Sequence, residues 1–377
     1  MRSFHYSSGV TDMIQVAQAN SVNGYLITHP ELAEMRVGYR EQMENGRTME
    51  RLSERHRESA TWFKERYEVI AKCHLVPTYR PEPLGDKTQR ICRYCGKSQP
   101  EVTFKNDAHA FPEQIGNKTF IDCMECDTCN EHFARMVDDD FAKWTQPYRT
   151  MGRVRGKRGI PTLKSSDEAF RVEGQNDKQL LISHRKDDPR YSDDEENKLV
   201  TLALERQPYV PMGVFKCLVK MALAIMPTED ATACDHLKRW ILAPSHTYES
   251  YPYRPLNIFV QHISGPLPND QIAGFLLRRN ADRNDCPFLI FVLQFSNAAI
   301  QINLPMHEQD RVLLSGKPFE LRLFPHVWGT VDHESAYGAS SHSVADMSTT
   351  EVVKGDVITM HFRYDHAVDG KGRHTGR

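Results

Sequence analysis

The sequence has no long apolar run and no strong excess of either charge. No stretch approaches the roughly 18 to 20 apolar residues that a transmembrane helix needs, so we expect no membrane segment. The first residues, MRSFH, lack the apolar core of a secretory signal, which favours a cytoplasmic location. With a formal net charge of −2 the chain is not a polycation, so any contact with nucleic acid must come from a local basic surface.

The cysteine pattern also lacks the spacing of a disulfide framework. The chain has nine cysteines, and five of them lie in the stretch from Cys92 to Cys129. Such crowding is typical of a metal site in a reducing compartment. The pairs Cys92/Cys95 and Cys126/Cys129 can supply four thiolates to a structural zinc ion at about 2.3 Å. Because four thiolates leave no open position on the metal, catalysis must take place elsewhere.

Cys123 leaves the second pair ambiguous, because Cys123, Cys126 and Cys129 form two overlapping Cys-x-x-Cys frames. We favour the frame that ends at Cys129, because a helix can then begin at that cysteine. Apolar residues at helical spacing from Glu131 to Trp144 indicate this helix. In this interpretation Cys123 is a packed thiol outside the metal site.

A histidine followed by a proline lies between the two cysteine pairs, in the run DAHAFPEQIGNK at residues 107–118. His109 suits a general base, because imidazole titrates near neutral pH. Asn130 offers a neutral oxygen to a hard cation such as Mg²⁺. Asn117 could hydrogen-bond the histidine or the main chain that positions it, and Lys118 could meet a phosphate. Each of these residues also has a purely structural interpretation as a packed histidine, a helix cap or a turn residue.

Taken together, three motifs resemble the HNH endonucleases, which are His-Me finger nucleases with a ββα-metal core. They are Cys92-x-x-Cys95, the run HxxPExIGNK that begins at His109, and the run CDxCN that ends at Asn130. The resemblance implies that His109 is the general base, that Asn130 is a metal-ligand position on the helix and that Asn117 is the middle asparagine. It also implies a catalytic Mg²⁺ or Mn²⁺ and a nucleic-acid substrate, for which we expect double-stranded DNA.

One position departs from the pattern of that family. Many members carry Asp, Glu or His immediately before the base as a second metal ligand, where this chain has Ala108. Asp107 lies two residues before the base, and a strand would place both side chains on the same face. Glu113 or His132 could also supply the missing ligand. A finger that has lost its activity is the alternative.

A short basic segment follows the cysteines. Residues 149–158 contain no acid and carry Arg149, Arg153, Arg155, Lys157 and Arg158. Their position beside the predicted nuclease finger favours contact with phosphates. A solvated linker would have the same charge pattern.

The expected fold class is α+β, with a zinc-stapled ββα-metal finger between an N-terminal helical segment and a larger C-terminal mixed α/β domain. A narrow apolar stripe from Met49 to Ile70 predicts a helix that packs on the body of the protein or pairs with a second copy in a homodimer. The expected divisions are a helical region and linker at 1–87, the finger at 88–148, a basic linker at 149–165, the C-terminal domain at 166–365 and a disordered tail at 366–377.

The C-terminal half alternates apolar runs with turn residues. A helix is predicted from Pro211, and the run FLIFVL at 288–293 predicts a strand buried on both faces. Strands are expected at 169–172, 179–183, 199–204, 256–262, 272–277, 288–295, 298–304, 319–324 and 357–362. This domain could read DNA sequence, mediate oligomerisation or sense a small-molecule or protein regulator. A zinc finger that binds nucleic acid without cutting it is the competing function.

Overall fold

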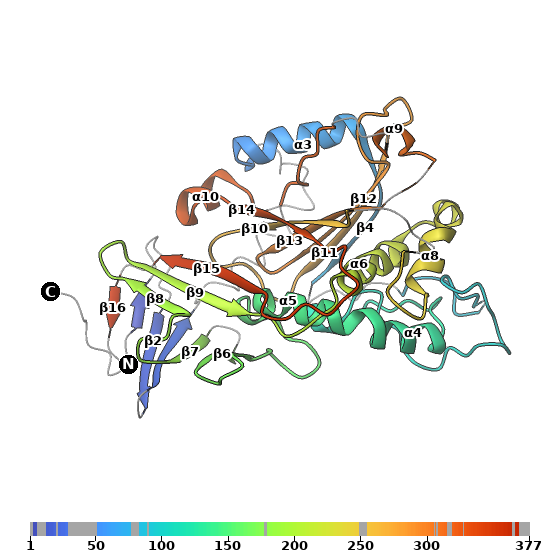
Figure 1. Cartoon of the computed structure of the whole chain (residues 1–377). Coiled ribbons are helices and arrows are strands. Elements are labelled where there is room, and N and C mark those ends of the chain that lie inside the picture. Colours follow the sequence, from blue (N-terminus) through green and yellow to red (C-terminus); the bar gives the residue numbers. More distant parts are fainter. Residues whose placement is uncertain are drawn as a thin grey trace.

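The computed structural model describes residues 3–5, 13–19, 22–28, 51–76, 83–88, 90–176, 179–248, 255–304, 306, 308–314, 319–326, 328–363 and 366–368. In this part of the chain, three antiparallel sheets are arranged around a group of buried helices (Figure 1). None of the helices described there is both long and apolar enough to cross a membrane.

The central sheet has six strands in the order β14-β10-β13-β12-β11-β4, and every neighbouring pair is antiparallel. Its strands are β4 (Tyr67–Leu75), β10 (Asn257–His262), β11 (Ile272–Arg279), β12 (Leu289–Phe295), β13 (Ala298–Leu304) and β14 (Ser341–Asp346). All seven residues of β12 are buried, as its apolar sequence predicts. The strand expectations at β10 to β13 are therefore confirmed.

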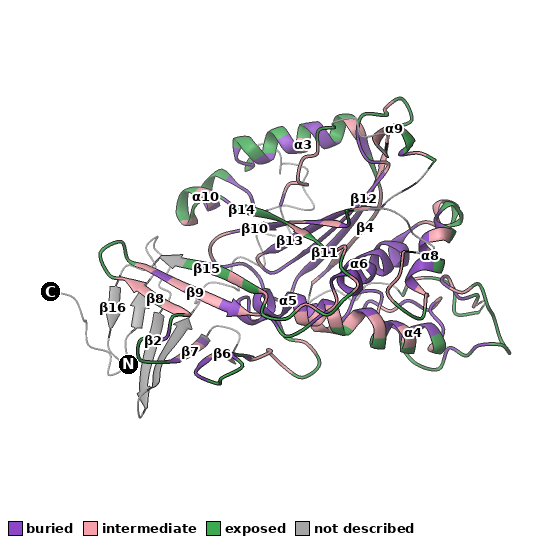
Figure 2. Ribbon diagram, in the orientation of Figure 1, coloured by how far each residue is buried: buried purple, intermediate pink, exposed green. Residues whose placement is uncertain are grey.

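The two faces of the central sheet carry different helices. On β12, Ile290 and Val292 belong to a cluster with Trp62 and Phe63 of α3 (Glu54–Arg66). The alternate residue Phe291 belongs to the main core on the opposite face, which contains all of α6 (Pro211–Ile225) apart from its proline, its glycine and its two lysines. Figure 2 shows α6 and the inner strands as buried. Helix α3 therefore packs on the body of the protein, as one of the two sequence-based alternatives predicted.

Among the described residues of 1–87, strands contribute more residues than helix, which corrects the mainly helical expectation for this part of the chain. Strands β1 (Ser3–His5), β2 (Met13–Ala19) and β3 (Val22–Thr28) form part of a seven-stranded sheet. Helix α3 ends at Arg66, and β4 begins at the next residue. Although the apolar stripe continues to Ile70, its β-branched residues fit a strand, and pairing with β11 supplies the hydrogen bonds that a longer helix would have made.

The predicted helix after the second cysteine pair is confirmed, and it begins at Asp127. It consists of α4 (Asp127–Phe133), a π-helical stretch η2 (Ala134–Asp138) and α5 (Asp139–Met151). Helix α6 begins with Pro211 in its first turn, where proline is preorganised for a helix. The Val210 N–H just before it donates to Asp140 Oδ1 of α5 at 2.9 Å. The two long helices are thus joined at this end of α6.

The seven-stranded sheet has the order β16-β1-β2-β3-β7-β6-β5, and a three-stranded sheet has the order β15-β9-β8. Their remaining strands are β5 (Leu163–Lys164), β6 (Phe170–Asn176), β7 (Gln179–Arg185), β8 (Tyr191–Asp194), β9 (Leu199–Glu205), β15 (Val357–Arg363) and β16 (His366–Val368). The strand expectations at β6, β7, β9 and β15 are confirmed. Short helices complete the elements: η1 (Glu113–Ile115), α7 (Thr228–Ala231), η3 (Thr232–Cys234), α8 (Asp235–Ile241), α9 (Arg311–Leu314) and α10 (Val331–Tyr337).

Two further expectations are corrected. Residues 319–324 form no strand, and a glutamine side chain of the central sheet binds the main chain of this segment instead. The Gln301 amide donates to Arg322 O at 3.0 Å and its oxygen accepts from Phe324 N–H at 2.7 Å. The predicted tail from residue 366 begins with β16, which pairs with β1. Residues 369–377 lie outside the described residues.

Candidate functional site

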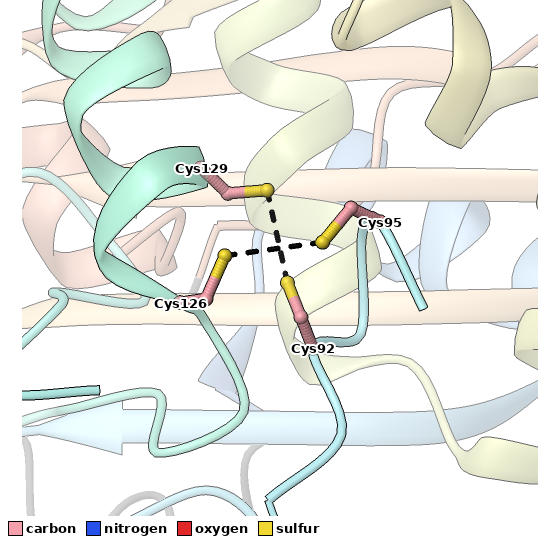
Figure 3. A group of neighbouring side chains, drawn as sticks. All are labelled: Cys92, Cys95, Cys126 and Cys129. Atoms are coloured by element: carbon pink, nitrogen blue, oxygen red, sulfur yellow. Dashed lines mark hydrogen bonds between the residues drawn. The ribbon is translucent and has the colours of Figure 1, made fainter. Parts of the chain in front are cut away.

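The four cysteines of the two favoured pairs converge on one point (Figure 3). The Sγ atoms of Cys92, Cys95, Cys126 and Cys129 all lie within 4.8 Å of one another. Cys92 and Cys129 are 3.7 Å apart at sulfur, and Cys95 and Cys126 are 3.8 Å apart. Four thiolates bound tetrahedrally at about 2.3 Å are separated by about 3.8 Å, so this arrangement fits a zinc ion.

Cys123 lies outside this group, which confirms the favoured cysteine frame. It is buried, and its N–H donates to Leu84 O at 2.9 Å. Cys126 is the N-cap residue of α4 and Cys129 lies in its first turns, so the last cysteine pair ties the metal group to the start of this helix.

Two extended segments lie antiparallel between the cysteine pairs. His109 forms an isolated bridge with Ile121, and the Ala110 N–H donates to Phe120 O at 3.1 Å. Helix α4 begins six residues after this second segment, at Asp127. The order of the elements is therefore extended segment, loop, extended segment and helix, and His109 lies on the first of them.

Asn117 organises the loop that joins the two extended segments. Its side chain is buried, with 1% exposure. The amide group donates to Phe111 O at 2.7 Å and to Phe120 O at 3.0 Å. The side-chain oxygen accepts from Phe120 N–H at 2.9 Å and from Thr119 N–H at 3.2 Å. Because its donors and acceptor are all engaged with the main chain, the Asn117 side chain orders the loop after His109.

His109 lies at the surface of this arrangement, with 23% of its side chain exposed. Partial burial lowers the pKa of His109, the Glu113 carboxylate opposes this effect, and the positive charge of Lys220 adds to it. Its Nε2 lies 3.9 Å from Glu113 Oε1, which is too long for a hydrogen bond. Glu113 Oε2 lies 3.8 Å from Lys157 Nζ, so this carboxylate stands between the imidazole and the basic segment.

The other residues predicted to bind the catalytic metal ion are not joined to His109 by hydrogen bonds among the described contacts. Asp107 is exposed, and its negative charge partly opposes the lowering of the His109 pKa. Asn130 is half-buried on α4, and no hydrogen bond joins it to His109 in the described part of the chain. His132 Nε2 lies 3.1 Å from Ile241 O at the end of α8, so its ring is engaged there. Within the described ranges, the four thiolates are the only group of three or more Cys, His, Asp or Glu side chains close enough to share an ion.

The structure separates the predicted phosphate-binding residues into two sets. Lys118, Arg155, Lys157 and Arg158 are exposed. Arg149 and Arg153 are buried, with 6% and 4% exposure, which corrects their assignment as surface contacts.

Arg149 belongs to the end of α5 rather than to a linker. Its guanidinium donates to Ala142 O at 2.5 Å within that helix and to Gln114 O at 3.4 Å in the loop after His109. Burial lowers its pKa to about 10, so the side chain stays charged at neutral pH. Arg149 therefore ties α5 to the His109 loop instead of facing solvent.

Sequence reasoning missed the contacts between the first cysteine pair and α6. Arg93 donates to Leu223 O at 3.2 Å and to Met226 O at 3.3 Å, where the last carbonyls of α6 lack helical partners. Tyr94 donates from its hydroxyl to Lys220 O at 3.3 Å. In the sequence, these contacts are hinted at only by two lysines four residues apart in an otherwise apolar helix. The charge pattern does not show that either lysine lies near the cysteines.

Residues 92–145 match the family model of the HNH endonucleases. The match confirms the family that the motifs predicted, and it covers the cysteines, the His109 loop and the following helix. The chain therefore contains an HNH endonuclease segment, which indicates a nuclease acting on nucleic acid. No curated protein and no solved structure matches the chain.

Proposed function

We propose that the protein is a metal-dependent endonuclease that hydrolyses phosphodiester bonds with His109 as its general base. The observation that carries the proposal is a partly exposed imidazole on an extended segment of the HNH match, which is followed by a loop ordered by Asn117 and is flanked in the sequence by the two cysteine pairs. In this proposal the thiolates hold a structural zinc ion, and the assembly is a ββα-metal finger.

The proposed reaction begins with proton transfer to His109. Its lowered pKa keeps the imidazole neutral at physiological pH, so it can accept a proton from water. The water oxygen bonds to phosphorus and the bond from phosphorus to the 3′-oxygen breaks, with the leaving oxygen taking a proton from solvent. A bound Mg²⁺ or Mn²⁺ would neutralise the leaving 3′-oxygen.

The residues available to hold that ion are Asn130, Asp107 and Glu113. The loose approach of Glu113 to the imidazole favours it as the carboxylate that takes the role of the ligand missing at Ala108. Because Mg²⁺ usually keeps several water ligands, one or two protein oxygens beside a phosphate are enough to bind it.

Double-stranded DNA is the proposed substrate. Lys118, Arg155, Lys157 and Arg158 are exposed in the loop after η1 and in the segment after α5, and they can neutralise phosphates. Arg149 and Arg153 are not part of this surface, because both are buried. The salt dependence of DNA binding should therefore reflect the small number of exposed cations that contact DNA phosphates.

The test compares nicking of supercoiled plasmid by the wild type and by His109→Ala with Mg²⁺ or Mn²⁺ present. Loss of a general base should slow cleavage about 10²–10⁴-fold. His361→Ala, at an exposed histidine on β15, is the matched control and should cleave like the wild type. Equal cleavage by His109→Ala and the wild type rejects the role of His109.

The competing function is a zinc finger that binds nucleic acid without cutting it. It predicts salt-sensitive DNA binding by the wild type and by His109→Ala, with no metal-dependent nicking by either. The same preparations distinguish the two functions when binding and cleavage are both measured.

A further inference from the structure

Lys220 is a charged residue in the middle of a buried helix. Only 1% of its side chain is exposed, and its neighbours on α6 are almost all apolar. A buried lysine without partners loses its proton, because the charged form is poorly solvated. Such a residue is therefore retained in its charged form only where other groups compensate for the lost water.

The hydrogen-bond and ion-pair partners that the structure gives to the Lys220 ammonium come from the HNH segment. Its Nζ donates to the main-chain carbonyl of His109 at 3.3 Å. The same atom lies 3.6 Å from Glu125 Oε2 and 3.9 Å from Asp138 Oδ2. It also stands 5.4 Å from the centre of the Phe133 ring, within the range of a cation–π contact.

These partners keep the ammonium charged. Burial alone would lower the pKa of Lys220, but nearby carboxylates, Asp138 first and Glu125 second, raise it above its ordinary value. Burial also raises the pKa of Glu125 to about 8, which the Lys220 ammonium opposes, so the charge of Lys220 depends on Asp138 more than on Glu125. One cation thus joins the extended segment of His109, the residue before Cys126 and the π-helical stretch η2. Among the hydrogen bonds and ion pairs of the described residues, no other side chain of α6 contacts all three of these parts of the HNH segment.

We propose that Lys220 is a positioning residue of the nuclease: its ammonium holds the His109 carbonyl and thereby fixes the main chain that presents the His109 imidazole. This inference rests on the proposed function of His109. It adds a residue from outside the HNH match, more than a hundred positions along the chain, to the machinery of that segment.

The positioning role is distinct from simple stabilisation, because the donated hydrogen bond ends on the residue that carries the imidazole. Without this donor the His109 carbonyl is buried against an apolar side chain, and the extended segment must shift to find a partner. A displacement of about 1 Å at a catalytic group can reduce turnover on the order of a hundredfold. Substrate binding by exposed cations should change little.

Lys216 provides a matched control on the same helix, one turn away. It is equally buried, and its Nζ donates to Ser245 O at 3.3 Å and stands over the Trp240 ring. Lys216→Met therefore removes a buried cation from α6 without touching His109. We expect it to leave the kcat of plasmid nicking within about threefold of the wild type.

The test variant is Lys220→Met combined with Glu125→Gln, so that the fully buried carboxylate is not left opposite an apolar side chain; Asp138, whose side chain is 15% exposed, keeps its charge. Zinc content and the melting temperature establish that the protein is folded. We expect kcat to fall between about tenfold and a hundredfold while KM stays within about threefold. An unchanged kcat, or an equal fall in Lys216→Met, overturns the proposal.

A second readout does not depend on cleavage. In the NMR spectrum, the Cε1–H resonance of the His109 ring can be assigned by its loss in His109→Ala. Its chemical shift should change in the Lys220 variant and stay unchanged in Lys216→Met. If the wild type cuts no nucleic acid, the proposed function fails, while this resonance still tests the link between Lys220 and His109. An unmoved resonance in a folded Lys220 variant contradicts that link.

Discussion

Asn117 shows how one buried side chain can order a loop through hydrogen bonds to the main chain. Asn117→Ala removes four hydrogen bonds and leaves buried main-chain groups of Phe111 and Phe120 without partners. We expect this change to lower the free energy of unfolding by about 2–4 kcal/mol. Urea denaturation measures the loss. Asn106→Ala, at an exposed position of the same segment, should change it by less than about 0.5 kcal/mol.

The lowered pKa of Lys216 predicts how the free energy of unfolding depends on pH. Burial lowers its pKa to about 8, below the roughly 10.4 of an unfolded lysine. Between these two values the unfolded state binds more protons than the folded state, so this group makes stability rise with pH from about 8 to about 10. Below that window its charge opposes folding.

Lys216→Met should therefore be more stable than the wild type at pH 7, and the difference between them should shrink as the pH rises to 10. Urea midpoints of both proteins at pH 7, 8, 9 and 10 measure this difference. A difference that stays constant over this range would show that Lys216 keeps its proton in the folded protein.

At the residue scale, the sequence predicted chemistry better than exposure. Cys92, Cys95, Cys126 and Cys129 converge as their spacing requires, because a Cys-x-x-Cys turn presents both sulfurs to one point. Arg149 and Arg153 looked like their exposed neighbour Arg155 in the sequence. Their burial depends on the helix end and loop that surround them, which a charge pattern does not contain.

At the scale of elements, the cysteine group is predicted to hold the start of α4. Zinc bound by thiolates contributes on the order of 10 kcal/mol to the folding of small zinc domains. Cys129→Ser should therefore lose most of its zinc and fray α4, whereas Cys123→Ser, at a buried thiol outside the group, should keep it. Zinc content and helical circular dichroism measure both effects. Equal zinc in the two variants would contradict the assignment of the ligands.

Helix and strand predictions succeeded where one pattern dominated and failed where two competed. Strand β12 is apolar apart from Gln294 and is buried on both faces, as predicted. The stripe ending at Ile70 satisfied helical spacing, but β4 begins at Tyr67 because β11 offers it a full set of main-chain partners. Such a partner lies about two hundred residues along the chain, so local periodicity cannot reveal it.

For the whole molecule, the HNH segment and the C-terminal half share one hydrophobic core. Phe111 and Phe133 of the segment belong to the same buried cluster as Leu218 of α6 and Phe291 of β12. The domain boundaries expected after residue 148 and before residue 166 follow changes in composition, yet the buried core continues across both of them. This continuity explains why the contacts made by Arg93, Tyr94 and Lys220 could not be predicted from the motifs alone.

Gly274 of β11 offers a direct test of this shared core. A Cβ added there would lie 2.6 Å from Cζ of the Phe111 ring and 2.9 Å from Cys73 Sγ. Phe111 follows His109 by two residues, so a clash in the central sheet should be felt in the His109 loop. We expect Gly274→Ala to lower stability by about 1–3 kcal/mol, as overpacked cores do, and to slow plasmid nicking.

Phe111→Leu removes the ring edge that meets the new methyl group, so the double variant Gly274→Ala/Phe111→Leu should lose less stability than the two single changes predict when added. A double-mutant cycle from urea denaturation measures this coupling, which contacting residues show at about 0.5–3 kcal/mol. Purely additive losses would mean that the sheet and the His109 loop adjust independently. The nuclease segment would then be a separate folding unit that packs on the sheet without sharing its core.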